Sequence, residues 1–383
     1  MAQRAQVLPE FPPAVAHAPR RFYQPELDGL RFYAFLAVFA FHIFPETRAF
    51  YSGLHLPLKP LWVGLAKFGA CGVDLFFALS AFLITSLLLR ERQQTGGISL
   101  RLFYVRRILR IWPLYFVVLA VAVVLAHTIA SQNLPWYYLV GYLLFVGNWI
   151  MAAFGRPMSV CAPLWTVSIE EQFYLVWPAL MKMLGRRGMI IAAAATFLLA
   201  TLSQIGAVLT GLSPRYIYYG SASRSSSLAL GILLALFADR LPGLTRGRRW
   251  LILAAGLAGW IAASGWLIDQ PGPQDMRAVL GRLVASVGAV AILYAGLGSR
   301  SRVVTSDWVV WLGKISYGLY MLHFVAILIL VDLLHPRWGW PLLAAKALGL
   351  PLTVLLAWAS YRWVESPFLR WKDRFATVLS RPV

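Results

Sequence analysis

Long apolar runs constrain this sequence more than any other feature, because each can cross a bilayer as a helix. A spanning helix needs about 20 mostly apolar residues, and candidates lie at 28–45, 69–89, 111–130, 164–181, 189–209, 225–239, 250–268, 279–298, 313–332 and 341–363. Hydrophobic residues make up 60% of the chain and charged residues only 13%, whereas a soluble chain carries about 25% charged residues. So much apolar surface cannot be buried inside one soluble domain. The sequence therefore predicts an all-α, polytopic integral membrane protein with about ten transmembrane helices.

The positions of the basic residues indicate how the chain is threaded. Lys and Arg collect in the cytoplasmic loops of membrane proteins, so the net charge of +20 needs no nucleic-acid partner. With ten spans, all strongly basic connections fall on one side: 90–110, 182–187, 240–249, 300–314 and the C-terminus. An eleventh apolar segment, 135–152, would invert the later half of this pattern if it crossed. We therefore expect 135–152 to be re-entrant or interfacial and both termini to be cytoplasmic.

The chain is expected to have three parts. These are a cytoplasmic N-terminal segment at 1–27, a transmembrane domain at 28–368 and a cytoplasmic tail at 369–383. Residues 1–27 lack the short apolar core of a cleavable signal, so the first apolar run should stay as a membrane helix. Two cysteines are too few for a disulfide framework or a zinc site. No motif indicates a metal.

The first apolar run carries Arg31 near one end and His42 near the other. An ionisable residue inside a span costs about 2.5–3.5 kcal/mol on insertion scales, which marks a functional site. Eleven residues return to within about 20° of the same helix face and rise roughly 16 Å. Arg31 and His42 are therefore predicted to share a stripe that faces the bundle or a cavity. The plainer alternative is a snorkelling arginine and a packed histidine.

Carboxylates lie in the second and fourth runs. Asp74 is in the outer part of one, and Glu170 and Glu171 are in the outer half of the other. We expect all three at a depth similar to that of His42. A carboxylate beside an imidazole orients it and raises its basicity, which suits a general base. Neighbouring helical residues point about 100° apart, so only one of the two glutamates can face His42. A buried structural ion pair is the alternative.

Arginines form a further candidate site. Arg106, Arg107 and Arg110 lie on or beside one helical face just before the third run. Guanidinium groups bind phosphate through planar, bidentate hydrogen bonds, although part of this cluster is ordinary inside-positive charge. Two weaker candidates stand alone. Arg224 begins a span on the outer side, as a ligand or an interfacial anchor, and His323 lies near mid-membrane, either lining a cavity or packing against tyrosines.

Six motifs in order resemble the acyltransferase-3 family, from about residue 22 to 370. They are Arg31–x10–His42, Gly72–Phe77, Arg106–Tyr115, Ser168–Tyr174, Ile315–Tyr320 with His323, and Tyr361–Phe368. The family consists of bacterial membrane proteins that move an acyl group, usually acetyl from acetyl-CoA, onto sugar hydroxyls. Their acceptors include exopolysaccharides, O-antigens, peptidoglycan and secondary metabolites.

The resemblance implies roles for the matching residues. His42 is similar to the family's catalytic histidine and Arg31 to its arginine partner, while Glu170 or Glu171 resembles the essential acidic position. Arg106, Arg107 and Arg110 resemble the family's basic motif on the acetyl-CoA side, where we also place Tyr115. From their positions in the chain, we further expect Tyr174, Arg224 and His323 to bind the acceptor. The chain departs from the family at Ala81, where relatives usually carry glycine, so the cavity is expected to be slightly narrower. Because the chain ends at residue 383, we expect no fused extracytoplasmic esterase-like domain.

These inferences predict an O-acetyltransferase in the bacterial inner membrane. Acetyl-CoA would come from the cytoplasm, and His42, oriented by Glu170 or Glu171 and by Asp74, would deprotonate a hydroxyl of a surface-glycan or lipid-linked sugar. Direct transfer and an acyl-His42 intermediate both stay open. A proton-coupled transporter would use similar buried charges, but no inverted repeat accompanies them. An inert flippase or scaffold is a third alternative, which the presence of Arg31 and His42 disfavours. The sequence gives no oligomeric state.

Overall fold

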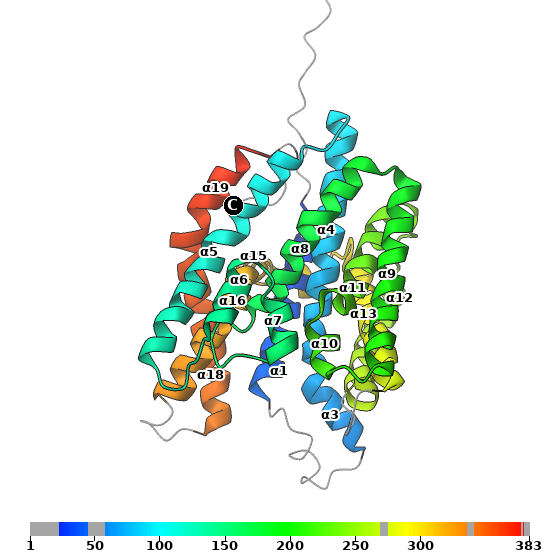
Figure 1. Ribbon diagram of the computed structural model, residues 1–383. Coiled ribbons are helices and arrows are strands. Elements are labelled where there is room, and N and C mark those ends of the chain that lie inside the picture. The colour runs from blue at the N-terminus through cyan, green and yellow to red at the C-terminus, as the bar shows by residue number, and fades with distance from the viewer. Residues whose placement is uncertain (1–22, 45–57, 269–274, 335–340, 377, 379–383) are drawn as a thin grey trace, which may run out of the picture.

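The computed structural model describes residues 23–44, 58–268, 275–334, 341–376 and 378. Within these ranges the chain is helical and contains no strand (Figure 1). The longer helices are α1 (Pro25–Ile43), α4 (Gly72–Thr95), α5 (Leu100–Thr128), α8 (Leu164–Met183), α9 (Arg186–Leu209), α11 (Ser221–Phe237), α12 (Arg246–Ala262), α13 (Met276–Gly296), α16 (Ser316–Leu328) and α18 (Leu342–Ser360). The shorter ones are α3 (Lys59–Lys67), α6 (Trp136–Leu143), α7 (Gly147–Phe154), α10 (Pro214–Tyr219), α14 (Arg302–Thr305), α15 (Asp307–Lys314) and α19 (Ser366–Asp373). Short 3-10 or π turns are η1 (Phe68–Cys71), η2 (Ala238–Arg240), η3 (Ala263–Ile268), η4 (Ile329–Leu334) and η5 (Tyr361–Glu365).

Each of the ten predicted apolar runs overlaps one of the longer helices. Seven helical segments in the described chain are long and apolar enough to cross a membrane, and the pair α15–α16, bent by 72°, adds an eighth if it counts as one span. The two remaining runs fold as α1 and α8, which carry the charged residues Arg31, Glu170 and Glu171 among others. The chain thus has the pattern of a polytopic membrane protein, and ten spans stays a prediction.

The segment 135–152 forms two short helices instead of one span. α6 and α7 have eight residues each, or about 12 Å of helix, too short to cross a bilayer. The break between them includes Phe145, whose φ of 54° is in the left-handed region. Its ring packs against Tyr115 with the centroids 4.7 Å apart, and its carbonyl accepts a hydrogen bond of 2.8 Å from Gln172 of α8. The break is therefore tied to α5 and α8.

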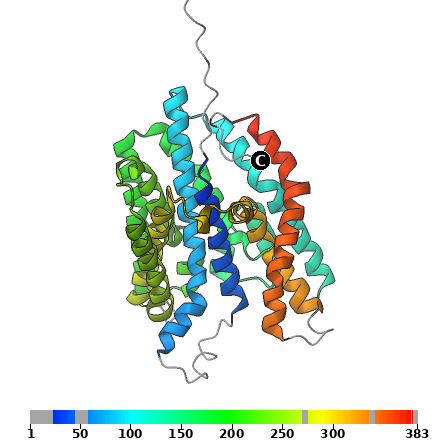
Figure 2. The same cartoon turned by 180° about the vertical axis from the view of Figure 1, so that it is seen from behind.

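Helix α1 lies in the middle of the bundle, with α4 and α16 beside it (Figure 2). Two glycines allow the η1–α4 segment to come this close. A Cβ on Gly69 would lie 2.0 Å from the carbonyl oxygen of Ala37, and one on Gly72 would lie 2.6 Å from that of Ala34. Since no side chain fits in such gaps, the glycines fix α4 directly against the helix that carries Arg31 and His42.

Of the expected three parts, the N-terminal one is mostly outside the described residues, which begin at residue 23. The limits predicted at 27 and 368 do not coincide with breaks in the fold, because α1 begins at Pro25 and α19 runs on to Asp373. In Figure 1, α1 runs downward and ends at the lower end of the bundle, whereas α4 runs upward. We refer below to the upper end as the Arg106 end and to the lower end as the His42 end.

Candidate active site

Three adjoining cavities run through the bundle from the Arg106 end to the His42 end. The first, the Arg106 cavity, has a volume of about 120 Å³, the second, the Glu170 cavity, about 100 Å³, and the third, the His42 cavity, about 500 Å³. The first two share Arg31, Ser80, Arg107 and Arg110 as lining residues. The second and third share Val73 and Tyr320. The chain therefore contains an internal path that is wide at the His42 end and narrow in the middle.

The Arg106 cavity is positively charged. Its described lining includes five cationic side chains and two carboxylates, namely Arg31, Arg106, Arg107, Arg110 and Lys372 against Asp28 and Glu91. Arg106 donates a hydrogen bond of 2.7 Å to Glu91 and another of 3.0 Å to the carbonyl of Phe375. The structure thus gathers the three arginines predicted to bind phosphate, together with Arg31, around one cavity.

The Glu170 cavity separates the two glutamates that the sequence left as alternatives. Glu170 faces this cavity, among Ser80, Tyr174 and Arg107. The hydroxyls of Ser80 and Tyr174 are hydrogen-bonded to each other. Glu171 is absent from the lining of all three cavities and instead accepts a hydrogen bond of 3.5 Å from the indole of Trp112. The turn of about 100° between successive helical residues thus points only Glu170 into the path.

His42 lies in the third cavity beside a second histidine. The ring centroids of His42 and His323 are 5.3 Å apart, and Phe324 lies 4.7 Å from His42. Nδ1 of His323 is 2.6 Å from the carbonyl oxygen of Tyr320, and Nε2 has no hydrogen-bond partner within the described chain. A carbonyl can only accept, so Nδ1 carries the proton and Nε2 a lone pair. The sequence left His323 as a residue that lines a cavity or packs against tyrosines. The structure places it fully buried beside Tyr320 and His42, behind the wall of the His42 cavity.

The predicted carboxylate beside His42 is not found there. Among the described residues, none of the hydrogen bonds or ion pairs involves His42, and Glu170 lies one cavity further along the path. The reason is the depth at which α8 begins. Pro163 and Trp165, at the start of the helix, line the same cavity as His42. Glu170, five residues beyond Trp165, lies about 7.5 Å further along the helix and so past the level of His42.

Asp74 is also placed differently from the prediction. Its Oδ2 lies 3.4 Å from Nη2 of Arg224, and its Oδ1 accepts a hydrogen bond of 2.8 Å from Ser227. Both partners are on α11. Asp74 therefore orients Arg224 and not His42. Beside this pair lies Arg282 of α13, which the sequence reading missed, although an arginine in the apolar run 279–298 was itself a signal.

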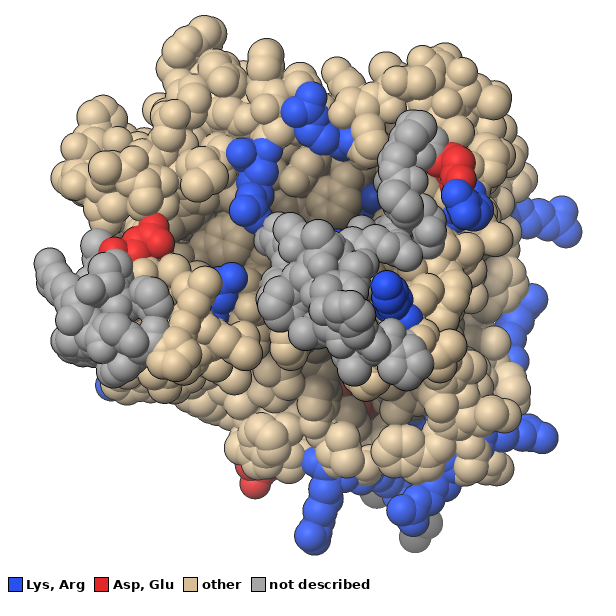
Figure 3. Space-filling model, turned by 90° about the horizontal axis from the view of Figure 1, so that it is seen from below, with Lys and Arg blue, Asp and Glu red and all other residues tan. Residues whose placement is uncertain are grey.

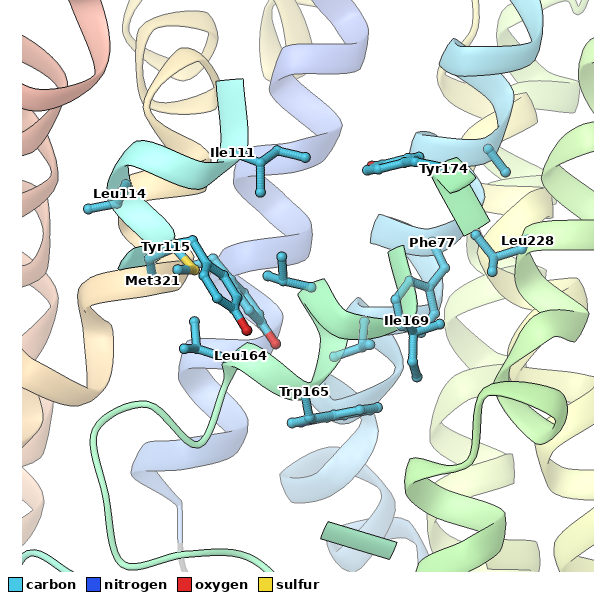
Figure 4. Close-up of a cluster of buried hydrophobic side chains, with 14 of the residues drawn as sticks. Phe77, Ile111, Leu114, Tyr115, Leu164, Trp165, Ile169, Tyr174, Leu228 and Met321 are labelled. Atoms are coloured by element: carbon cyan, nitrogen blue, oxygen red, sulfur yellow. The ribbon is translucent and has the colours of Figure 1, made fainter. Parts of the chain in front are cut away.

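Tyr115 does not face the predicted donor site. Its side chain is fully buried, and its hydroxyl donates a hydrogen bond of 2.8 Å to the carbonyl of Tyr142. Figure 4 shows its ring in the hydrophobic core with Leu114 and Met321, while Tyr174 lies across from them next to α4. Tyr115 thus has a structural position in this fold, and Tyr174 lines the Glu170 cavity.

The described residues contain no group of three or more His, Cys, Asp or Glu that could hold a metal ion. The cavities combine a cluster of cations suited to binding phosphate at one end with an imidazole at the other. This arrangement suits a long, thin, anionic donor and a base, which is the chemistry of acyl transfer from a thioester.

Comparison with known proteins agrees with this class. A family model described as an acyltransferase domain matches residues 24–362, so the chain belongs to the acyltransferase-3 family. It is 28% identical over 380 residues to "Peptidoglycan O-acetyltransferase OatA" of Listeria monocytogenes, which covers 91% of this chain and 56% of that protein. It is 30% identical over 378 residues to "Putative peptidoglycan O-acetyltransferase YrhL" of Bacillus subtilis, covering 90% and 55%.

A third relative is a "Putative O-acetyltransferase" of Staphylococcus aureus, 26% identical over 402 residues, with 94% of this chain and 61% of the relative covered. The chain therefore spans little more than half the length of the curated relatives it matches. No solved structure matches it.

Proposed function

We propose that this protein is a membrane O-acetyltransferase that moves acetyl from acetyl-CoA to a sugar hydroxyl of an envelope or exported polysaccharide. The observation that carries the proposal is the path of three cavities that joins an arginine cluster to a histidine. Acyl transfer from a CoA thioester needs these two features a long way apart, because the phosphates and the thioester sit at opposite ends of the donor.

The donor side is assigned to the Arg106 cavity. CoA carries several phosphate charges on its nucleotide, and arginine binds phosphate with bidentate geometry. The pantetheine arm is long and thin, which fits the narrow Glu170 cavity of about 100 Å³. The helical rise from Arg31 to His42 is roughly 16 Å, so a thioester threaded along α1 reaches the His42 cavity while the phosphates stay near Arg31.

The reaction needs one base at the His42 cavity. His42 removes the proton from the acceptor hydroxyl as the oxygen attacks the thioester carbonyl carbon. The tetrahedral intermediate collapses, the C–S bond breaks, and the CoA thiolate takes the proton from His42. His323 acts as the positioning residue, since its Nε2 is an acceptor beside the His42 ring. The alternative, an acyl-His42 intermediate, uses the same groups in two steps.

Orientation in the membrane follows from the same assignment. Acetyl-CoA is cytoplasmic, so the Arg106 end is the cytoplasmic end, with both termini on that side and residues 28–368 as the transmembrane domain in the inner membrane. The large His42 cavity then opens toward the outer side, where a lipid-linked or nascent glycan is available. The curated relatives named for peptidoglycan make a cell-wall glycan one candidate acceptor.

Two measurements test the proposal on the purified protein in nanodiscs and on membrane vesicles that retain envelope glycans. Wild type should bind acetyl-CoA and release free CoA thiol. H42A should bind acetyl-CoA but lower thiol release by about 10²–10⁴-fold, the usual contribution of a general base. R106A/R110A should bind acetyl-CoA poorly.

The matched control is K182A/R187A, which removes two exposed cations that line none of the three cavities. It should behave as wild type. If correctly folded wild type neither binds nor cleaves acetyl-CoA, the donor assignment is wrong and the transporter alternative gains weight.

A further inference from the structure

Two buried arginines occupy the His42 end of the bundle without a mechanistic role so far. Arg224 of α11 is 5% exposed and Arg282 of α13 is 6% exposed. Both line a further cavity of about 170 Å³, and Arg282 also lines the His42 cavity. The two cavities share Phe41, Ala70, Tyr218, Ile268 and Arg282. The arginines therefore face a side chamber that opens directly onto the space where His42 lies.

The charges of this side chamber do not balance. Asp74 is the single carboxylate in its described lining. The Arg224–Asp74 contact of 3.4 Å is longer than the 2.7–2.9 Å usual for a charge-assisted hydrogen bond. Arg282 makes neither a hydrogen bond nor an ion pair with any described residue, and the Nε atoms of both arginines lack partners there. One carboxylate thus serves two buried cations, an unfavourable state unless another anion binds.

Aromatic rings hold the guanidinium groups in place without neutralising them. Arg282 lies 5.2 Å from the ring centroid of Tyr218, and Arg224 lies 5.7 Å from those of Tyr218 and Trp165. Such cation–π contacts orient a guanidinium, but its N–H groups can still donate hydrogen bonds in the plane of the guanidinium itself. Two oriented, buried and incompletely paired guanidiniums have the geometry that recognises an oxyanion.

The wider wall has the same sign. Lys67, Arg156 and Arg215 also line the side chamber or the His42 cavity, and no described Asp or Glu besides Asp74 does. Figure 3, which views the molecule from this end, shows Lys and Arg side chains gathered around the hollow in the face and few acidic ones. The positive-inside bias does not account for basic residues here if this end faces outward. A positive cleft concentrates anionic ligands.

We propose that Arg224 and Arg282 form an anion subsite for the acceptor, so that the glycan modified at His42 carries a carboxylate or a phosphate near the reacting hydroxyl. The inference rests on the proposed function and adds the chemical class of the acceptor to it. Asp74 and Ser227 fix Arg224 in this subsite, which gives Asp74 a positioning task at the acceptor and none at His42.

The first arm of the test identifies the acceptor's charge directly. Vesicles that contain the wild-type protein and envelope glycans receive radiolabelled acetyl-CoA, and the labelled glycan is fractionated by anion exchange at neutral pH. The label should elute with anionic glycans. Treating the labelled glycan with phosphatase before the column should abolish its retention if the anion is a phosphate monoester. Carbodiimide amidation of the labelled glycan at the same step should abolish retention if the anion is a carboxylate.

The second arm uses variants of one helix. R282Q should lower glycan labelling by about 10- to 100-fold, the range expected for a lost hydrogen bond to a charged group, while acetyl-CoA binding at the opposite end stays unchanged. R282K keeps the charge and should retain most of the labelling. R277Q is the matched control, because Arg277 is on the same helix, is exposed, pairs with Asp275 at 2.7 Å and lines neither cavity.

Four results would overturn the inference. Label in neutral glycans, or wild-type labelling by R282Q, removes the anion subsite and leaves the proposed acetyltransferase intact. Loss of acetyl-CoA binding by R282Q would make Arg282 a residue of the general fold. A wild-type protein that labels no glycan and cleaves no acetyl-CoA would end the proposed function, and the subsite with it.

Discussion

The two ends of the cavity path are both rich in arginine, yet the arginines differ in how they are satisfied. At the Arg106 end, Arg106 pairs with Glu91 at 2.7 Å and its side chain is 17% exposed. At the His42 end, Arg282 is 6% exposed and has no ion-pair partner among the described residues. The first arrangement can exchange partners with water and a soluble donor. The second is held in a buried position beside a cavity, which favours selection of one class of ligand.

The two arginine clusters also differ in whether membrane insertion alone can explain them. Basic residues at one end of a membrane protein are expected from insertion alone, so the Arg106 cluster by itself says little about function. Its meaning comes from the connected path toward His42. If the His42 end faces outward, insertion does not explain its arginines, and an arginine inside an apolar run, as Arg282 is in 279–298, costs up to about 2.5–3.5 kcal/mol on insertion scales. A cost of that size indicates that the buried arginines have a function.

In the comparison of the two ends, the largest effect on turnover is expected from a change at His323, at the His42 end. H323A should lower the turnover number by about 10-fold or more, as part of the 10²–10⁴-fold contribution of the base that it positions, with acetyl-CoA affinity unchanged. The physical reason is the loss of the acceptor Nε2 beside the His42 ring. Steady-state kinetics and a separate acetyl-CoA binding curve measure the two quantities.

Free imidazole supplies the control for a positioning role. Because it can occupy the space left by the His323 ring, it should restore part of the turnover of H323A and none of that of H42A. A purely structural histidine would show lower acetyl-CoA affinity and a lower melting temperature, with no response to imidazole.

The next largest effect on the transfer rate is expected between the two ends of the path, where Glu170 and Glu171 can be compared. E170Q removes a carboxylate from a cavity lined by Arg31 and Arg107, and we expect about 10-fold slower transfer, since removing one charge of a buried set unbalances the others. E171Q should stay within about 2-fold, because its carboxylate is outside the path and its bond to Trp112 is a long 3.5 Å. Equal rates for the two variants would contradict the assignment of Glu170 to the path.

The sequence predicts the positions of the helices far better than it predicts which residues of different helices are in contact. Hydropathy alone places the ten apolar runs, since each run must bury its backbone polar groups in a helix. The relative depth of Glu170 and His42 is different, because it depends on the buried turn before Leu164, and no periodicity reports how deep a helix begins. The Asp74–Arg224 pair joins residues 150 positions apart, a contact that only the packing of α4 against α11 creates.

The smallest effect concerns a residue that lies outside the path. Y115F removes the hydrogen bond of 2.8 Å to the carbonyl of Tyr142, and a bond of this kind contributes about 0.5–1.5 kcal/mol to the free energy of unfolding. The Tyr142 carbonyl keeps a second donor, the amide of Phe145 at 3.1 Å, which favours the lower half of that range. Thermal melting in nanodiscs should show a small decrease, with acetyl-CoA affinity equal to that of wild type. Weaker acetyl-CoA binding without a change in melting would return Tyr115 to the donor site, and it would mean that the core around α5 opens when the donor binds.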